Sequence, residues 1–129
     1  MKRPMSFARS SVFSSLIAVC TLTIPSLTWG HAYPLAMVPA DGSTVSQAPR
    51  EIRIQFTEAV ELEFSRVEVK LSNGARFVQG KLRKIGVDAL AVELRPLVAG
   101  NYIVEWQVLS VDTHITEGVL RFTFNPVEP

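Results

Sequence analysis

The fold of this chain is decided by the stretch GNYIVEWQV at residues 100–108. Its apolar side chains Tyr102, Val104, Trp106 and Val108 alternate with polar or exposed-type residues, a period of two that is typical of a half-buried β-strand. Tyr102 follows a Gly-Asn pair at the start of this strand, as in a tyrosine corner whose hydroxyl bonds to upstream backbone. Trp106, on the same face, is expected in the core.

The same alternation recurs along the chain after residue 30. It predicts further strands over residues 35–38, 52–56, 67–71, 90–94 and 120–124, and a short one over 76–78. Turn-forming residues separate them at 39–43, 72–74, 85–88 and 98–101. Helix is expected only as a turn around residues 58–64. Seven short strands at this spacing predict an all-β fold, a seven-stranded antiparallel Greek-key β-sandwich or barrel of immunoglobulin-like type.

The first 30 residues have the pattern of a secretory signal peptide. Three basic residues precede an apolar run over 12–24, and small residues stand at Thr28 and Gly30, the −3 and −1 positions of a cut before His31. The run is short for a transmembrane span, so we expect no membrane insertion after cleavage. The mature domain is then residues 31–129, secreted and without cysteine, because Cys20 falls within the signal peptide.

The charge of the mature domain excludes partners that bind through a broad basic surface. The signal peptide holds three of the 13 basic residues and none of the 12 acidic ones, which leaves ten basic against twelve acidic side chains. Nucleic acids and anionic membranes need a basic surface, so neither is an expected partner. Any function is therefore expected to reside in a local site.

The mature domain contains two histidines, and both occupy places where a metal ion could bind. His31 would be its first residue, offering an α-amine and a ring nitrogen, and Cu(II) favours such nitrogen and oxygen donors. In an extended segment Asp112 and His114 would project to one face, roughly 7 Å apart. The alternative is incidental: any residue can begin a chain, and Asp-Thr-His can be a turn with a solvated imidazole. Residue types and spacing leave both interpretations open.

The chain resembles the CopC/PcoC/YobA family of periplasmic copper-resistance proteins. The resemblance is carried by the initial histidine, VPADGS at 38–43, IRIQFTE at 52–58, LVAGNYIVEW at 97–106, LSVDTH at 109–114, and Gly118. The Gly-x-Tyr-x-x-x-Trp pattern followed by Ser-x-Asp-Thr-His is its most specific part.

This resemblance implies a periplasmic protein with a seven-stranded Greek-key fold and a Cu(II) site made by His31, Asp112 and His114. Copper is the implied ligand, and an inner-membrane copper transporter of the CopD type is the implied partner. Glu58, in the family-like Phe-Thr-Glu stretch, is a candidate for supporting the site; otherwise it is one of several exposed glutamates with Glu61 and Glu63.

One departure from the family separates two kinds of copper site. Some members carry a methionine-rich loop for Cu(I), but residues 70–84 contain no methionine, histidine or cysteine, and Met37 is the one methionine of the mature domain. Soft thioethers select Cu(I), so a single Cu(II) site used for sequestration, resistance or delivery is expected, without a Cu(I) site.

Two other functions compete with this one. A histidine-brace copper monooxygenase would also use an N-terminal histidine, although this chain is short for a broad substrate face. A metal-free immunoglobulin-like interaction module would need neither histidine. A hydrolase is disfavoured, because no Ser/His/Asp or Cys/His set is evident, and we expect the protein not to be an enzyme.

Overall fold

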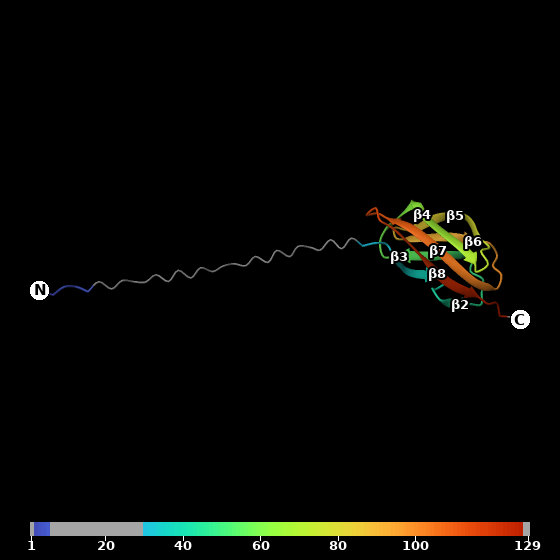
Figure 1. Ribbon diagram of the computed structural model, residues 1–129, viewed down its shortest axis with the longest axis horizontal. Helices are drawn as coiled ribbons and strands as arrows, with labels where there is room; N and C mark the ends of the chain where they lie inside the picture. The colour runs from blue at the N-terminus through green and yellow to red at the C-terminus, as the bar shows by residue number, and fades with distance from the viewer. Residues whose placement is uncertain (1, 6–29, 128–129) are drawn as a thin grey trace.

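The computed structural model describes residues 2–5 and 30–127. Most of the predicted signal peptide, residues 6–29, lies outside the described residues. Eight strands follow in the order β1 (Pro34–Val38), β2 (Ser43–Val45), β3 (Glu51–Phe56), β4 (Val60–Leu71), β5 (Val78–Gly86), β6 (Ala89–Leu94), β7 (Gly100–Ser110) and β8 (Ile115–Phe124) (Figure 1). Within the described residues, no helix is long and apolar enough to cross a membrane.

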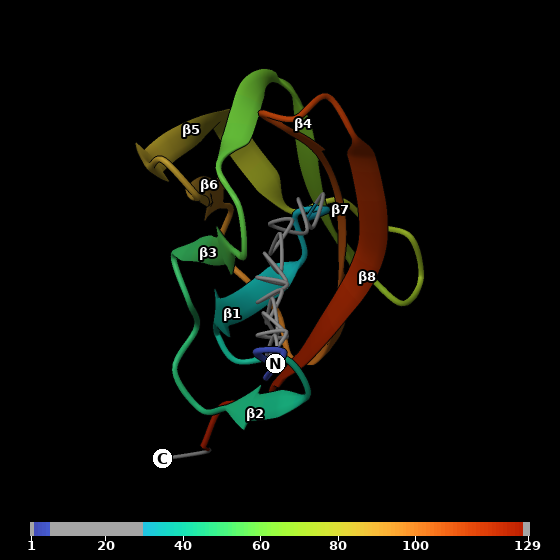
Figure 2. The ribbon, with the colours of Figure 1, turned by 90° about the vertical axis from the view of Figure 1, so that its left-hand side faces the viewer.

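The strands form two four-stranded sheets that face each other. One sheet has the order β1-β3-β6-β5 and the other β2-β8-β7-β4, and Figure 2 shows them as two layers. Neighbouring strands are antiparallel except for β2, which pairs with β8 in parallel. The chain crosses repeatedly between the layers, as in Greek-key sandwiches. The predicted fold class is confirmed.

The core lies between the two sheets and is built from the inward positions predicted by the alternation. Phe56 at the end of β3 packs edge-on against Trp106 of β7, with 5.6 Å between ring centroids. Tyr102 stacks on Phe122, and its hydroxyl donates to the carbonyl of Val98 at 2.6 Å, which confirms the tyrosine corner.

Gly118 of β8 makes room for the indole of Trp106. A Cβ at position 118 would stand 2.8 Å from Cζ2 of the ring, closer than packed atoms tolerate. This glycine therefore belongs to the same packing unit as Trp106, on the strand pair that carries the Asp-Thr-His segment.

The predicted helical turn over residues 58–64 is wrong, because β4 begins at Val60. The strand is irregular there: its pairing with β7 shifts between Glu61 and Arg66, and the Ser65 hydroxyl bonds to the Glu61 carbonyl at 2.6 Å. A β-bulge of this kind breaks the period of two and leaves several successive residues exposed. The sequence then looks unlike a strand although the backbone is extended.

The region between residues 76 and 88 was also predicted wrongly. In place of a short strand over 76–78, β5 runs from Val78 to Gly86, and the turn is confined to residues 87–88. This strand forms the edge of its sheet and is mostly exposed, so few of its residues had to be apolar. The three-residue β2 was missed because it is too short to show a period, and the strand count is eight in place of seven.

Candidate metal-binding site

Asp112 and His114 lie on a tight turn that connects β7 to β8. The amide of Ser110 bonds to the carbonyl of His114 and the amide of Thr113 to the carbonyl of Ser110, both at 2.9 Å. Thr113 has a φ of 71°, which makes residues 111–113 a three-residue hairpin loop that ends in a left-handed residue. Of the two conformations left open by the sequence, the segment adopts the turn and not the extended one, and the turn brings the two side chains together.

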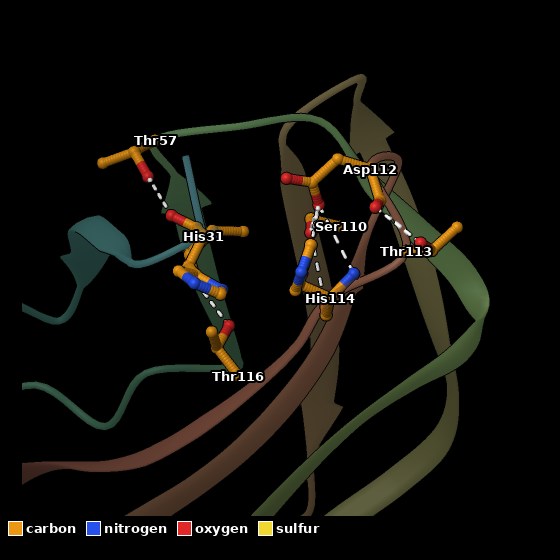
Figure 3. A network of polar contacts seen from close by, with 8 residues as sticks. His31, Thr57, Ser110, Asp112, Thr113, His114 and Thr116 are labelled. Atoms are coloured by element: carbon orange, nitrogen blue, oxygen red, sulfur yellow. Dashed lines mark hydrogen bonds and ion pairs between the residues drawn. The ribbon is translucent and has the colours of Figure 1, made fainter. Parts of the chain in front are cut away.

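The turn places the carboxylate of Asp112 against the ring of His114. Oδ1 of Asp112 lies 3.4 Å from Nδ1 of His114 and also 3.4 Å from its amide nitrogen (Figure 3). Ser110 is buried, and its hydroxyl bonds to the same Oδ1 atom of Asp112. The hydroxyl also lies 3.0 Å from the carbonyl oxygen of His114. One buried serine thus forms hydrogen bonds with both residues that are predicted to bind the metal.

The hydrogen bond from Ser110 is the main cause of a lowered pKa at Asp112. Contacts with the amide and ring of His114 act in the same direction, and partial desolvation opposes them. A hydrogen bond to the charged form of a carboxyl group favours that form. Asp112 is therefore held as a carboxylate, the state in which it can bind a cation.

His31 lies beside this turn, as predicted. The centroids of the His31 and His114 rings are 4.8 Å apart, and the ring planes meet at 83°. Figure 3 shows His31 on the chain segment that faces the turn carrying Asp112 and His114. Tyr33 completes a row of rings, 6.4 Å from His31 between centroids.

Glu58 is at the same end of the sandwich. A Cβ built on Gly30 would stand 2.6 Å from Oε1 of Glu58, so this carboxylate lies against the residue that precedes His31. Glu58 is exposed, as are Glu61 and Glu63, and its carboxylate also lies near the chain segment that leads into His31.

The side chains of His31, Asp112 and His114 are of types that bind metal ions and lie near one another, but they are not arranged around a single point. Two nitrogens that bind one ion at about 2 Å each lie no more than about 4 Å apart. The rings of His31 and His114 are close enough to meet this limit if their side chains rotate. Among the described residues, no group of three or more His, Cys, Asp or Glu side chains stands ready to hold an ion. In this chain the backbone nitrogen of His31 is still joined to Gly30, so one predicted donor is a peptide amide.

Comparison with known proteins places this arrangement in a family. Residues 35–125 match the family model described as the CopC domain. The chain belongs to the CopC family. The protein YobA of Escherichia coli K12 is 33% identical over 123 residues, which covers 93% of this chain and 97% of YobA. The crystal structure of CopC from Methylosinus trichosporium OB3b superimposes with a TM-score of 0.71 at 28% identity, covering 77% of this chain and 98% of that one.

A longer relative shows the CopC domain as part of a larger protein. The copper transport protein CutJ of Bacillus subtilis is 31% identical over 108 residues, which is 81% of this chain and 20% of CutJ. The similarity to CutJ is therefore confined to one segment of that protein.

Three polar residues that contact the segments carrying His31, Asp112 and His114 were given no role from the sequence. Ser110 stood within the Ser-x-Asp-Thr-His pattern, which was a signal, although no role was assigned to it. Thr57 and Thr116 contact residues 31–33 from positions 24 to 84 residues away in sequence. Nothing local in the sequence marks such contacts.

Replacing Ser110 by Ala should raise the pKa of Asp112. The serine hydroxyl stabilises the carboxylate, so its loss favours the protonated acid. Because the folded-state pKa is below the ordinary value, the stability linked to Asp112 is present above that value and lost as pH falls through the lowered pKa. In S110A this loss should occur at higher pH.

Carbon-detected NMR of the Asp112 carboxyl in copper-free protein measures the change, with Ser72→Ala as control. Equal titration curves of Asp112 in S110A and the wild type would refute the role of Ser110 in lowering this pKa.

Replacing Thr113 by Gly should stabilise this CopC-family domain by about 0.5–1 kcal/mol. The loop over residues 72–74 has the same bonding pattern, and there Gly74 occupies the left-handed position with a φ of 89°. A left-handed conformation costs a non-glycine residue about 1–2 kcal/mol, and the flexibility of glycine offsets about 0.5–1 kcal/mol of the gain.

Urea unfolding measures the stability of T113G. The reciprocal change, Gly74→Thr, is the matched control and should lower the stability of the domain, because it places a non-glycine residue in the left-handed conformation. A Cβ at position 74 would have no atom within 4 Å, so a steric clash does not contribute to the effect. If T113G is less stable than the wild type, Thr113 is not strained in this turn.

Proposed function

We propose that the protein is secreted to the periplasm, is cleaved after Gly30, and binds one Cu(II) ion through His31, Asp112 and His114. The observation that carries the proposal is the contact between the rings of His31 and His114, which lie 83 residues apart in sequence and 4.8 Å apart between centroids. CopC-family membership and the copper transport protein among the relatives support copper as the ion.

Cleavage would supply the donor that the uncleaved chain lacks. A free amine at His31 and the Nδ1 atom of the same residue can form a chelate ring with one ion. An imidazole nitrogen of His114 and a carboxylate oxygen of Asp112 complete four nitrogen and oxygen donors, the set that suits tetragonal Cu(II). Glu58, which lies against Gly30, would then be a carboxylate beside the new amino terminus.

Copper affinity should fall at acidic pH. The amine must lose its proton to bind, and a free α-amino group titrates near 8 in an unperturbed setting. Asp112 does not oppose binding in this range, because its pKa is lowered. The amine and the two imidazoles, which must also be unprotonated to bind, are therefore the donors at which protons compete with the ion.

We propose a single site, without a second one for Cu(I). The region 70–84 lacks methionine, histidine and cysteine. Met37 is only 6% exposed and belongs to the core, where its sulfur is covered by apolar neighbours. The thioethers that would favour Cu(I) are thus not offered at the surface by these residues.

The role that fits such a site is copper sequestration, resistance or delivery without catalysis. An inner-membrane copper transporter of the CopD type is the proposed partner. The length of CutJ supports this view, because a segment like this chain makes up one fifth of a protein named for copper transport.

Titration of the secreted protein with Cu(II) tests the proposal. Trp106 would be the one tryptophan of the cleaved chain, and it packs on Phe56 of the strand that leads to Thr57, so its fluorescence should fall until one equivalent is bound. Cu(I), added anaerobically with reductant, should bind far more weakly. Absence of saturable Cu(II) binding would refute the function, and sustained oxygen-dependent turnover on reductant would favour the monooxygenase.

A further inference from the structure

We infer that Thr57 and Thr116 form a hydroxyl clamp that fixes the spacing between His31 and His114. This inference rests on the proposed function, since it concerns how the same site is held. It assigns a positioning role to two threonines, one from each sheet, that do not touch the ion themselves.

Thr57 holds the N-terminal segment 31–33 from the sheet that contains β3. Its hydroxyl accepts a hydrogen bond from the amide of Tyr33 at 3.0 Å and donates to the carbonyl of His31 at 3.3 Å. Its own amide donates to the carbonyl of Tyr33 at 2.8 Å. One residue therefore bonds to the backbone on both sides of Ala32, and Figure 3 shows the bond to the carbonyl of His31.

Thr116 holds the same segment from the opposite sheet. Its hydroxyl donates to the carbonyl of Ala32 at 2.5 Å, and the side chain of Ala32 is fully buried between the layers. Thr116 follows His114 by two residues at the start of β8. This hydrogen bond therefore connects the segment that carries His31 to β8, the strand that begins directly after His114.

The clamp matters because a chain terminus is ordinarily poorly ordered. Terminal residues fray unless they are tied down, and an ion that must order them binds more weakly. Backbone bonds from Thr57 and Thr116 order residues 31–33 before an ion arrives, which is the general route by which preorganisation raises affinity. The carbonyls and amide they engage remain in place after cleavage, because cleavage changes only the nitrogen of His31.

Isosteric substitutions test the clamp in the secreted protein. We expect Thr116→Val to weaken Cu(II) binding about fivefold, the effect of losing about one net hydrogen bond, and Thr57→Val, whose hydroxyl makes two, to weaken it by about 5- to 25-fold. The double variant should bind about 25- to 125-fold more weakly. Thr57→Ser and Thr116→Ser keep the hydroxyl and should restore binding. Thr123→Val is the control, because Thr123 lies on the same strand as Thr116 but bonds to Asn101.

Two further readouts separate positioning from general stability. The Cu(II) electron paramagnetic resonance spectrum should change in T116V, because the two imidazoles are no longer held at one spacing, and should stay unchanged in T123V. In copper-free protein, an aminopeptidase should remove His31 faster from T57V and T116V than from the wild type or T123V.

The outcomes distinguish failure of the clamp from failure of the proposed function. If the wild type binds Cu(II) and the valine variants match it in affinity, spectrum and trimming rate, the clamp is refuted while the function stands. If the wild type does not bind Cu(II), the function is refuted, and unchanged trimming of the copper-free variants would refute the clamp as well.

Discussion

Retaining Gly30 in front of His31 is expected to weaken Cu(II) binding by about 100-fold or more, which is about 2.8 kcal/mol at 1.4 kcal/mol per tenfold. The added residue converts the amine of His31 into a peptide amide, which removes one donor and its chelate ring. Isothermal titration with a competing chelator, comparing proteins that begin at Gly30 and at His31, measures the difference.

The structure makes this comparison a clean one. Residues 31–33 are bonded to Thr57 and Thr116, and Ala32 is buried, while His31 is still joined to Gly30, so an extension does not disturb the fold. The two proteins should therefore unfold at the same temperature, and adding a residue after Pro129 should leave affinity unchanged. Equal affinity for Cu(II) in both would mean that the amine is not a ligand.

Replacing His114 by Ala should reduce Cu(II) affinity by about 1000-fold, or about 4.2 kcal/mol. The substitution removes the one imidazole donor that comes from the folded turn and leaves the chelate of His31 without an opposing ring. The side chain of His114 is 37% exposed, and substitutions at such positions cost little stability, so the melting temperature should change by only a few degrees.

The matched control for H114A is Thr113→Ala on the same turn. The Thr113 hydroxyl donates to the backbone carbonyl of Asp112 and is not a proposed ligand, so T113A should keep the Cu(II) affinity within about threefold of the wild type. Wild-type affinity in H114A would place the ion elsewhere. A large drop in T113A would show that turn geometry, more than the imidazole, controls binding.

Much of the fold could be predicted because large apolar residues recur at every second position of the buried strands. β3, β6 and β7 each place an apolar residue inward at every second position, and the corner at Tyr102 has a local signature. β5 could not be predicted, because an exposed edge strand imposes no such pattern. The start of β4 was obscured by a bulge, which is stabilised by pairing with β7 and has no local code.

The site was predictable to the extent that it consists of unusual residue types. Two histidines in the mature domain and an adjacent aspartate drew attention to His31, Asp112 and His114. The sequence left open whether Asp112 and His114 lie on a turn or on an extended segment, because the left-handed residue is a threonine where glycine or asparagine would have signalled the turn. Thr57 and Thr116 act through contacts set by tertiary structure, which one sequence does not reveal, whereas the contacts of Ser110 are local to the turn.

Pulsed electron paramagnetic resonance of the secreted protein with one equivalent of Cu(II) tests the central claim most directly. Histidine labelled with ¹⁵N either at the α-amine or in the ring would separate the amine of His31 from the imidazoles, and H114A would separate the ring of His114 from that of His31. The account predicts three coupled nitrogens, of which the amine coupling disappears when Gly30 is retained. A spectrum with coupling from one imidazole alone, or one that the retained Gly30 leaves unchanged, would contradict it.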